Sequence, residues 1–145
     1  MLDLKITVDG KAAPQGSKTR NRYGAVYESS KAVGPWRDAV RAEASRAMRE
    51  RGLRPVVSGP VRVSITFRVI RPKSHYRTGR FAAELRGSAP RYPDIKPDGD
   101  KLTRAVLDGL AAGGVYHDDG QVVDGSWRKR YADRPGADIE VSEML

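Results

Sequence analysis

One stretch in the last third of the chain decides the fold: Asp94-Ile-Lys-Pro-Asp-Gly-Asp-Lys-Leu-Thr-Arg-Ala-Val-Leu-Asp-Gly-Leu110, followed after a short gap by His117-Asp-Asp-Gly-Gln-Val-Val-Asp124. Asp98 or Asp100 is placed to cap a helix, and Gly113-Gly114 ends it. The apolar residues between them recur at helical spacing, at Leu102, Ala105, Val106, Gly109 and Leu110. A strand then begins near Gln121. The stretch therefore predicts a helix and a strand, each preceded by a pair of aspartates.

The rest of the chain supplies one more helix and three more strands. Apolar and polar residues alternate over 2–8, 61–69 and 138–142, as in half-buried strands, and 121–131 forms the remaining strand. Pro35 opens a helix that Gly52 ends, with Trp36 in its buried stripe. The order strand, helix, strand, helix, strand, strand predicts a single α+β domain over residues 1–145, with two helices packed on a mixed sheet.

Two stretches show no regular spacing of apolar residues, and both are rich in Lys and Arg. Residues 11–31 and 71–97 are predicted to be mobile loops on the domain. The Arg-bearing face of the strand at 61–69, with Arg62 and Arg68, is predicted to be open to solvent or to phosphate.

Composition narrows the class of protein. The chain has no cysteine and two histidines, which excludes disulfides and thiolate zinc sites and disfavours a histidine zinc site. No apolar run approaches the roughly 18 residues of a membrane span, so the cytoplasm is the expected compartment.

Charge indicates a polyanionic partner. The net charge is +9, and residues 14–54 and 68–104 each carry ten Lys or Arg against four acids. Such an excess favours nucleic acid. The candidate contacts are Lys18, Arg20, Arg22, Lys73, Arg77, Lys96 and Lys101. Tyr23 and Tyr27 could stack on unpaired bases. The alternative is a solvated basic surface whose tyrosines pack on the domain.

One segment of this basic chain is acidic: residues 105–127 contain four aspartates and no Lys or Arg. Asp98 and Asp100 cannot both cap one helix, although Asp118-Asp119-Gly120 alone favours a turn. If the helix brings the two acidic pairs together, a divalent cation is the simplest compensation. Carboxylate oxygens suit Mg²⁺, with Mn²⁺ as a substitute.

The runs Lys96-Pro-Asp-Gly-Asp-Lys-Leu102, Arg104-Ala-Val-Leu-Asp-Gly-Leu110 and Tyr116-His-Asp-Asp-Gly-Gln-Val122 resemble the RusA family of Holliday-junction resolvases. Pro14 to Lys18 and Arg71 to Tyr76 resemble phage and prophage members. The resemblance implies a homodimeric, Mg²⁺-dependent endonuclease that cuts four-way DNA junctions symmetrically in recombination and repair, in a bacterial or phage-infected cell. It implies catalytic metal ligands at Asp98, Asp100 and Asp119, with Asp118 as an accessory ligand.

Two positions depart from the family pattern. Lys101 stands where an asparagine is usual, and Arg104 stands where a catalytic lysine is expected. Arginine can stabilise phosphate charge but is a poor proton donor. Two alternatives therefore remain: a nuclease with broader specificity for branched DNA or RNA, and a non-catalytic DNA-binding module.

Overall fold

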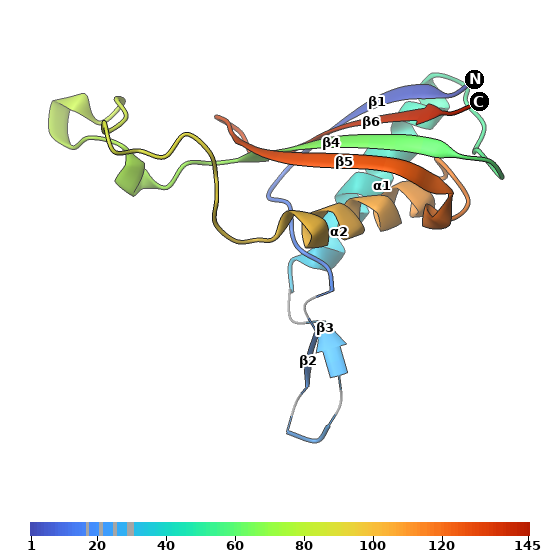
Figure 1. The fold of residues 1–145 in the computed structure, drawn as a ribbon, viewed down its shortest axis with the longest axis horizontal. Helices are drawn as coiled ribbons and strands as arrows, with labels where there is room; N and C mark the ends of the chain where they lie inside the picture. The colour runs from blue at the N-terminus through green and yellow to red at the C-terminus, as the bar shows by residue number, and fades with distance from the viewer. Residues whose placement is uncertain (17, 21, 25, 29–30) are drawn as a thin grey trace.

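The computed structural model of the protein describes residues 1–16, 18–20, 22–24, 26–28 and 31–145. Four strands form one mixed sheet in the order β1-β6-β4-β5 (Figure 1). They are β1 (Asp3–Asp9), β4 (Val61–Val69), β5 (Val122–Tyr131) and β6 (Gly136–Glu143). β4 lies in the interior of the sheet, antiparallel to β6 and parallel to β5. The predicted α+β class and the order of the main elements are confirmed.

Both helices pack on the same face of this sheet (Figure 1). α1 (Val33–Glu50) begins before Pro35, slightly earlier than predicted, and Trp36 is buried as expected. α2 (Gly99–Ala112) belongs to the crossover that parallel strands β4 and β5 require. The helices approach closely at Gly109, where an added Cβ would lie 2.7 Å from Val40 Cγ1. The core between sheet and helices thus fixes the position of α2.

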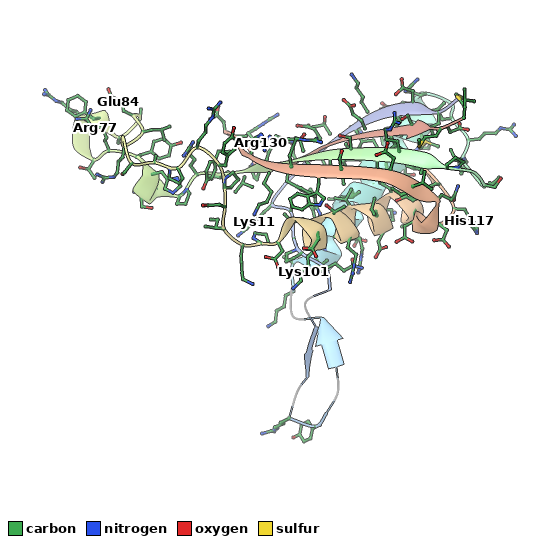
Figure 2. All side chains as sticks on the ribbon, in the orientation of Figure 1. Lys11, Arg77, Glu84, Lys101, His117 and Arg130 are labelled. Atoms are coloured by element: carbon green, nitrogen blue, oxygen red, sulfur yellow. The ribbon has the colours of Figure 1, made fainter. Side chains whose placement is uncertain are left out.

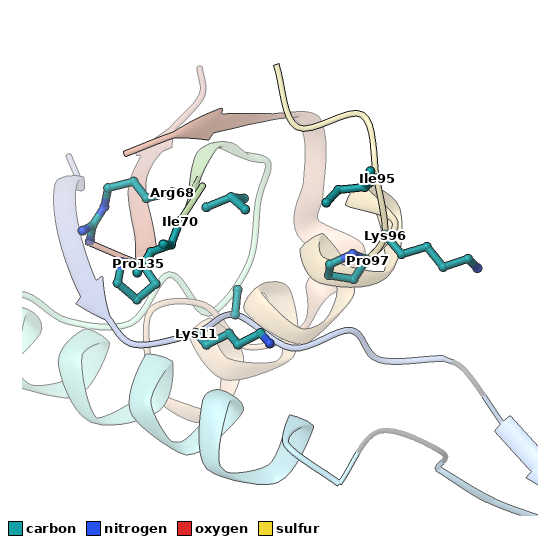
Figure 3. Close-up of a pocket in the computed structure, with 9 residues that line it drawn as sticks. Lys11, Arg68, Ile70, Ile95, Lys96, Pro97 and Pro135 are labelled. Atoms are coloured by element: carbon teal, nitrogen blue, oxygen red, sulfur yellow. The ribbon is translucent and has the colours of Figure 1, made fainter. Parts of the chain in front are cut away.

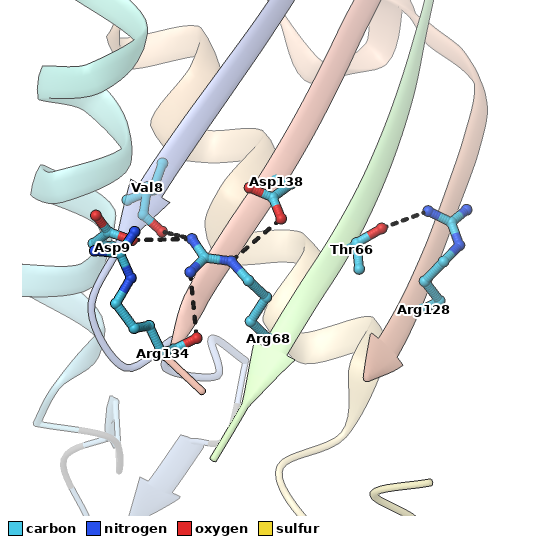
Figure 4. A network of polar contacts seen from close by, with 7 residues as sticks. All are labelled: Val8, Asp9, Thr66, Arg68, Arg128, Arg134 and Asp138. Atoms are coloured by element: carbon cyan, nitrogen blue, oxygen red, sulfur yellow. Dashed lines mark hydrogen bonds and ion pairs between the residues drawn. The ribbon is translucent and has the colours of Figure 1, made fainter. Parts of the chain in front are cut away.

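The opposite face of the sheet is polar, and the two arginines of β4 on this face are already paired. Arg62 forms an ion pair of 2.7 Å with Asp124. Arg68, whose side chain is only 14 % exposed, pairs with Asp9 and Asp138 and donates a hydrogen bond to the Val8 carbonyl (Figure 4). The prediction of an open face is wrong for Arg68, because β1 and β6 supply its partners. Arg62 is exposed to solvent as predicted, although it pairs with Asp124 of β5.

Two segments project from the domain (Figure 1). Within 11–31, β2 (Lys18–Arg20) pairs antiparallel with β3 (Val26–Glu28), so a loop throughout this range is a wrong prediction. We call this projection the hairpin. Residues 71–97, here called the arm, contain short 3₁₀ turns at Lys73–His75 and Gly79–Phe81 and a bridge between Tyr76 and Leu85. That the arm is mobile remains a prediction.

The arm returns to the domain just before α2 begins. The Lys129 Nζ atom donates to the carbonyl oxygens of Ile95 and Pro97, the latter at 3.0 Å. An apolar cavity of about 340 Å³ lies beside this return, between Ile70, Pro135 and Pro97 (Figure 3). β5 therefore holds the entry to α2 in place. Among the described helices, none is long and apolar enough to cross a membrane.

Candidate functional site

The solvent side of α2 carries a row of charged residues. Asp100, Arg104 and Asp108 are spaced four apart and so share one side of the helix. The ends of this row are about 12 Å apart along the axis, at 1.5 Å per residue. The other side of α2 is apolar and buried. Amphipathic spacing alone thus presents two carboxylates and a guanidinium to solvent.

The first turn of α2 holds the predicted pair Asp98 and Asp100. Asp98 occupies the N-cap position, as expected, but its carboxylate makes no capping hydrogen bond. Its Oδ2 atom lies 3.9 Å from Lys101 Nζ. Both aspartates are exposed, whereas Gly99 between them is buried beneath the Trp127 ring. Helix capping therefore does not account for either carboxylate.

The second pair lies beyond the other end of α2, and its two members differ. Asp118 caps a 3₁₀ turn at Asp119–Gln121 by accepting the Gly120 N–H at 2.9 Å. This hydrogen bond, and a second one with Asp119, lower the pKa of Asp118. The Gln121 side chain accepts in return from the Asp118 N–H at 2.9 Å. The turn interpretation is therefore correct for Asp118.

Asp119 lies in an acidic environment. Desolvation raises the pKa of its carboxyl group, and hydrogen bonding to Asp118 and the charge of Asp108 raise it further. Burial likewise raises the pKa of the nearby Tyr116 phenol, which donates to the Leu107 carbonyl at 2.7 Å. Three carboxyl groups, those of Asp108, Asp118 and Asp119, thus gather where α2 meets the following turn.

Asp108 is the member of this group that sequence reasoning missed. Its carboxylate accepts a hydrogen bond from Gln15 Nε2, and Arg37 of α1 donates to Gln15 Oε1 at 2.8 Å. The Gln15 N–H also donates to the Lys101 carbonyl at 3.0 Å. The four-residue spacing from Arg104 could have placed Asp108 in the row, but the contacts with Gln15 and Asp119 join distant parts of the chain.

The two acidic pairs do not form one group. Across the described ranges, no set of three or more His, Cys, Asp or Glu residues is arranged to hold a metal ion. The expectation that the helix brings the pairs together is therefore not met within one chain, because α2 keeps them at its two ends. The donor chemistry still suits a hard cation, since desolvation and acidic neighbours disfavour the ionised form of the Asp119 carboxyl group, and a bound cation would favour that form.

Arg104 lies between these two ends, beside the segment that precedes the hairpin. An added Cβ on Gly16 would come within 2.7 Å of Arg104 Nη1, so the Gly16 backbone lies close to the guanidinium, and a larger residue there would shift the end of the arginine side chain. In the described part of the chain, Arg104 has no ion-pair partner. The exposed Arg104 guanidinium therefore keeps an uncompensated positive charge on the solvent side of α2.

The predicted DNA contacts fall mainly on the two projections. The backbone of Lys18 and Arg20 lies in β2, but their side chains are outside the described residues. Arg22 packs on Tyr23 at the turn of the hairpin, 4.9 Å from the ring centroid. On the arm, Lys73 is exposed, whereas Arg77 pairs with Glu84 at 2.7 Å. Lys96 is exposed beside the start of α2 (Figure 3), where Lys101 is partly exposed.

A small, strongly basic α+β domain with basic residues on two projections is typical of the class of proteins that bind nucleic acid. Residues 7–142 match the family model described as Endodeoxyribonuclease RusA. This match covers nearly the whole chain, so the protein belongs to the RusA family of Holliday-junction endonucleases, as the resemblance indicated. None of the curated proteins compared with the chain matches it.

Proposed function

We propose that the protein is a Mg²⁺-dependent endonuclease that acts as a homodimer and resolves four-way DNA junctions by paired symmetric nicks, in recombination or repair. The observation that carries this proposal is the position of the carboxylate row. α2 begins where the hairpin and the arm diverge (Figure 1), so DNA held by both projections would pass its exposed side. Family membership supports the same substrate.

In this proposal the basic residues bind DNA and the acidic residues hold the metal ion. Lysines and arginines of the hairpin and arm would bind phosphates and orient the duplex arms without reading sequence. Arg104, midway along α2, would stabilise negative charge on the scissile phosphate. Asp98 and Asp100 at the start of α2, and Asp108, Asp118 and Asp119 at its other end, would supply oxygen ligands at two separate places in each chain. A bound Mg²⁺ would contribute Lewis-acid polarisation of the phosphate.

The proposal of a homodimer follows from the two-fold symmetry of the paired cuts. Two related cuts on a four-way junction require two active sites, and a two-fold dimer places them symmetrically. β4 is an interior strand and has no edge for a partner, whereas β1 and β5 are the two end strands of this sheet in the described residues, and β5 is the one that contacts α2. An antiparallel contact between the β5 strands of two protomers would give the unpaired N–H and C=O groups of the outer β5 edge hydrogen-bond partners.

The decisive experiment compares cleavage and binding on one labelled junction. Wild type, Asp100→Asn and Asp119→Asn are assayed for nicking in Mg²⁺, and for affinity in EDTA. We expect paired nicks from the wild type, loss of nicking in both variants, and unchanged binding. A second readout is thermal stability: Mg²⁺ should raise the melting temperature of the wild type more than that of Asp119→Asn.

Two other outcomes would overturn parts of the proposal. Equal cutting of forks, flaps or RNA hairpins would indicate a broader nuclease. Junction binding with no cutting in Mg²⁺ or Mn²⁺ would indicate a DNA-binding module, in which the ion pair between Lys101 and Asp98 replaces the metal.

A further inference from the structure

A second cavity, of about 390 Å³, lies where the arm meets the end of β5. Its size suits a single small ligand. The arm provides one wall and residues 130–133 provide the other, and the label of Arg130 in Figure 2 marks the position. The lining residues are Arg71, Tyr76, Leu85, Arg91, Tyr92, Arg130, Tyr131, Ala132 and Asp133. None of the α2 aspartates is among them, so this cavity is separate from the candidate site.

One side of the cavity is held in place by stacking. The Arg71 guanidinium lies over the Tyr131 ring, 4.2 Å from its centroid, and donates to the Pro90 carbonyl at 2.7 Å. His75 meets the same ring edge-on at 5.6 Å. These contacts join both ends of the arm to β5, so the cavity is largely formed before any ligand binds.

The other side presents a half-exposed aromatic ring with two guanidinium groups over it. Tyr92 is 49 % exposed, and the guanidinium carbons of Arg91 and Arg130 lie 5.4 and 5.2 Å from its ring centroid. Within the described residues, neither arginine forms an ion pair, although Asp133 lines the same cavity. By contrast, Arg77 farther along the arm is paired with Glu84. The positive charge beside Tyr92 is therefore available to an anion.

Both guanidinium groups contact the Tyr92 ring, and Arg130 also donates to the Lys129 carbonyl at 2.8 Å, but neither charge is neutralised by an ion pair among the described residues. An aromatic ring with two such charges matches the chemistry of a nucleotide, whose base stacks on tyrosine and whose phosphate binds arginine. Bases within a duplex are already stacked on each other, so the occupant has to be unpaired. We propose that this cavity binds one unpaired nucleotide of the DNA, with the base on Tyr92 and the phosphate between Arg91 and Arg130. The proposal rests on the proposed function for DNA as the substrate and adds a binding subsite to it.

The test measures binding of the full-length protein in EDTA, so that no cleavage occurs. The probes are a fluorescent oligothymidine eight nucleotides long and a four-way junction with one unpaired thymidine at the branch. Tyr92→Leu, which keeps apolar volume but removes the ring, should bind both probes about tenfold more weakly. Tyr92→Phe should bind like the wild type. Arg130→Gln should bind more weakly, with a salt slope lower by about 1.

Arg54→Gln is the matched charge control, because Arg54 is exposed and precedes β4, at the opposite end of that strand from the arm. Its affinity should stay within about twofold of the wild type. The proposal is overturned if the wild type does not bind the oligothymidine, if Tyr92→Leu keeps full affinity, or if Arg130→Gln loses no more than Arg54→Gln.

A parallel cleavage assay in Mg²⁺ separates this proposal from the proposed function. If the wild type leaves junctions intact while oligothymidine binding depends on Tyr92, the subsite stands and the proposed function fails. If junctions are cut and Tyr92→Leu binds and cuts like the wild type, the proposed function stands and the subsite fails.

Discussion

At the scale of single residues, the carboxyl groups of Asp118 and Asp119 have pKa values shifted in opposite directions. The shift is downward for Asp118, whose carboxylate accepts the Gly120 N–H. Its contribution to stability is present at neutral pH and is lost as the pH falls through its folded pKa. The shift is upward for Asp119. Its contribution is therefore present at acidic pH and is lost as the pH rises through its folded pKa.

Replacing Asp119 by asparagine should consequently stabilise the protein at pH 8. The neutral amide can donate to Asp118 and Asp108, which an ionised carboxylate cannot do. We expect a melting temperature higher by about 1–3 °C at pH 8. The difference should disappear near pH 4, roughly the usual pKa of a carboxyl group. Asp118→Ala is the control, and it should lower the melting temperature at pH 8 because the turn loses its cap. A destabilised Asp119→Asn at pH 8 would contradict this account.

Arg104 offers a second test at this scale. If it stabilises phosphate charge, Arg104→Ala should slow junction cleavage by about 10²–10³-fold, as removal of one charge-stabilising donor does elsewhere. Arg104→Lys should keep most of the rate. A lysine variant much faster than the wild type would show instead that this position transfers a proton, and full activity in the alanine variant would remove Arg104 from the mechanism.

At the scale of elements, Gly99 determines how α2 meets the sheet. A Cβ at this position would lie 2.1 Å from the Trp127 ring, which is 45 % exposed at the edge strand β5. The two aspartates on either side of Gly99 therefore depend on a residue without a side chain. Any larger residue must displace the indole or the first turn of the helix.

Gly99→Ala should accordingly destabilise the fold by about 1–3 kcal/mol and reduce cleavage as well. Gly34→Ala provides the matched control, because Gly34 lies in α1 with no other atom within 4 Å of an added Cβ. That change should be neutral or slightly stabilising, since alanine is the better helix former. Thermal melts followed by circular dichroism measure both. Equal stability of the two variants would show that Trp127 moves aside freely.

Arg68 tests whether the paired face of the sheet has a structural role. Arg68→Met removes its ion pairs and its hydrogen bonds to the Val8 and Arg134 carbonyls. The expected loss is about 1–3 kcal/mol, because charged hydrogen bonds of a largely buried group are removed. Arg62→Met, which breaks an exposed pair, should cost less than about 1 kcal/mol. DNA affinity should stay unchanged in both variants, and weaker binding by Arg68→Met would assign this face to the DNA.

At the scale of the whole molecule, DNA binding should depend on the two projections. The double variant Arg20→Ala with Arg22→Ala alters the hairpin alone. We expect weaker junction binding and a salt slope lower by roughly 2, since about one counterion is released per phosphate contact. Arg54→Ala is the control for removing an exposed charge from the body of the domain. Unchanged affinity and slope in the double variant would exclude the hairpin from the interface.

The sequence by itself determined the α+β class, the order of the main elements and the positions of Asp98, Asp100 and Arg104 along α2, because these follow from local periodicity and from the residues that begin and end helices and turns. It also indicated the family. Only the tertiary structure showed that Asp118 caps a turn, that Asp119 meets Asp108, and that the two acidic pairs stay apart. Contacts between residues distant in the chain decide those features, and periodicity carries no information about them. The same reason applies to Arg68, whose partners lie on β1 and β6, and to the cavity at Tyr92, whose walls come from separate segments.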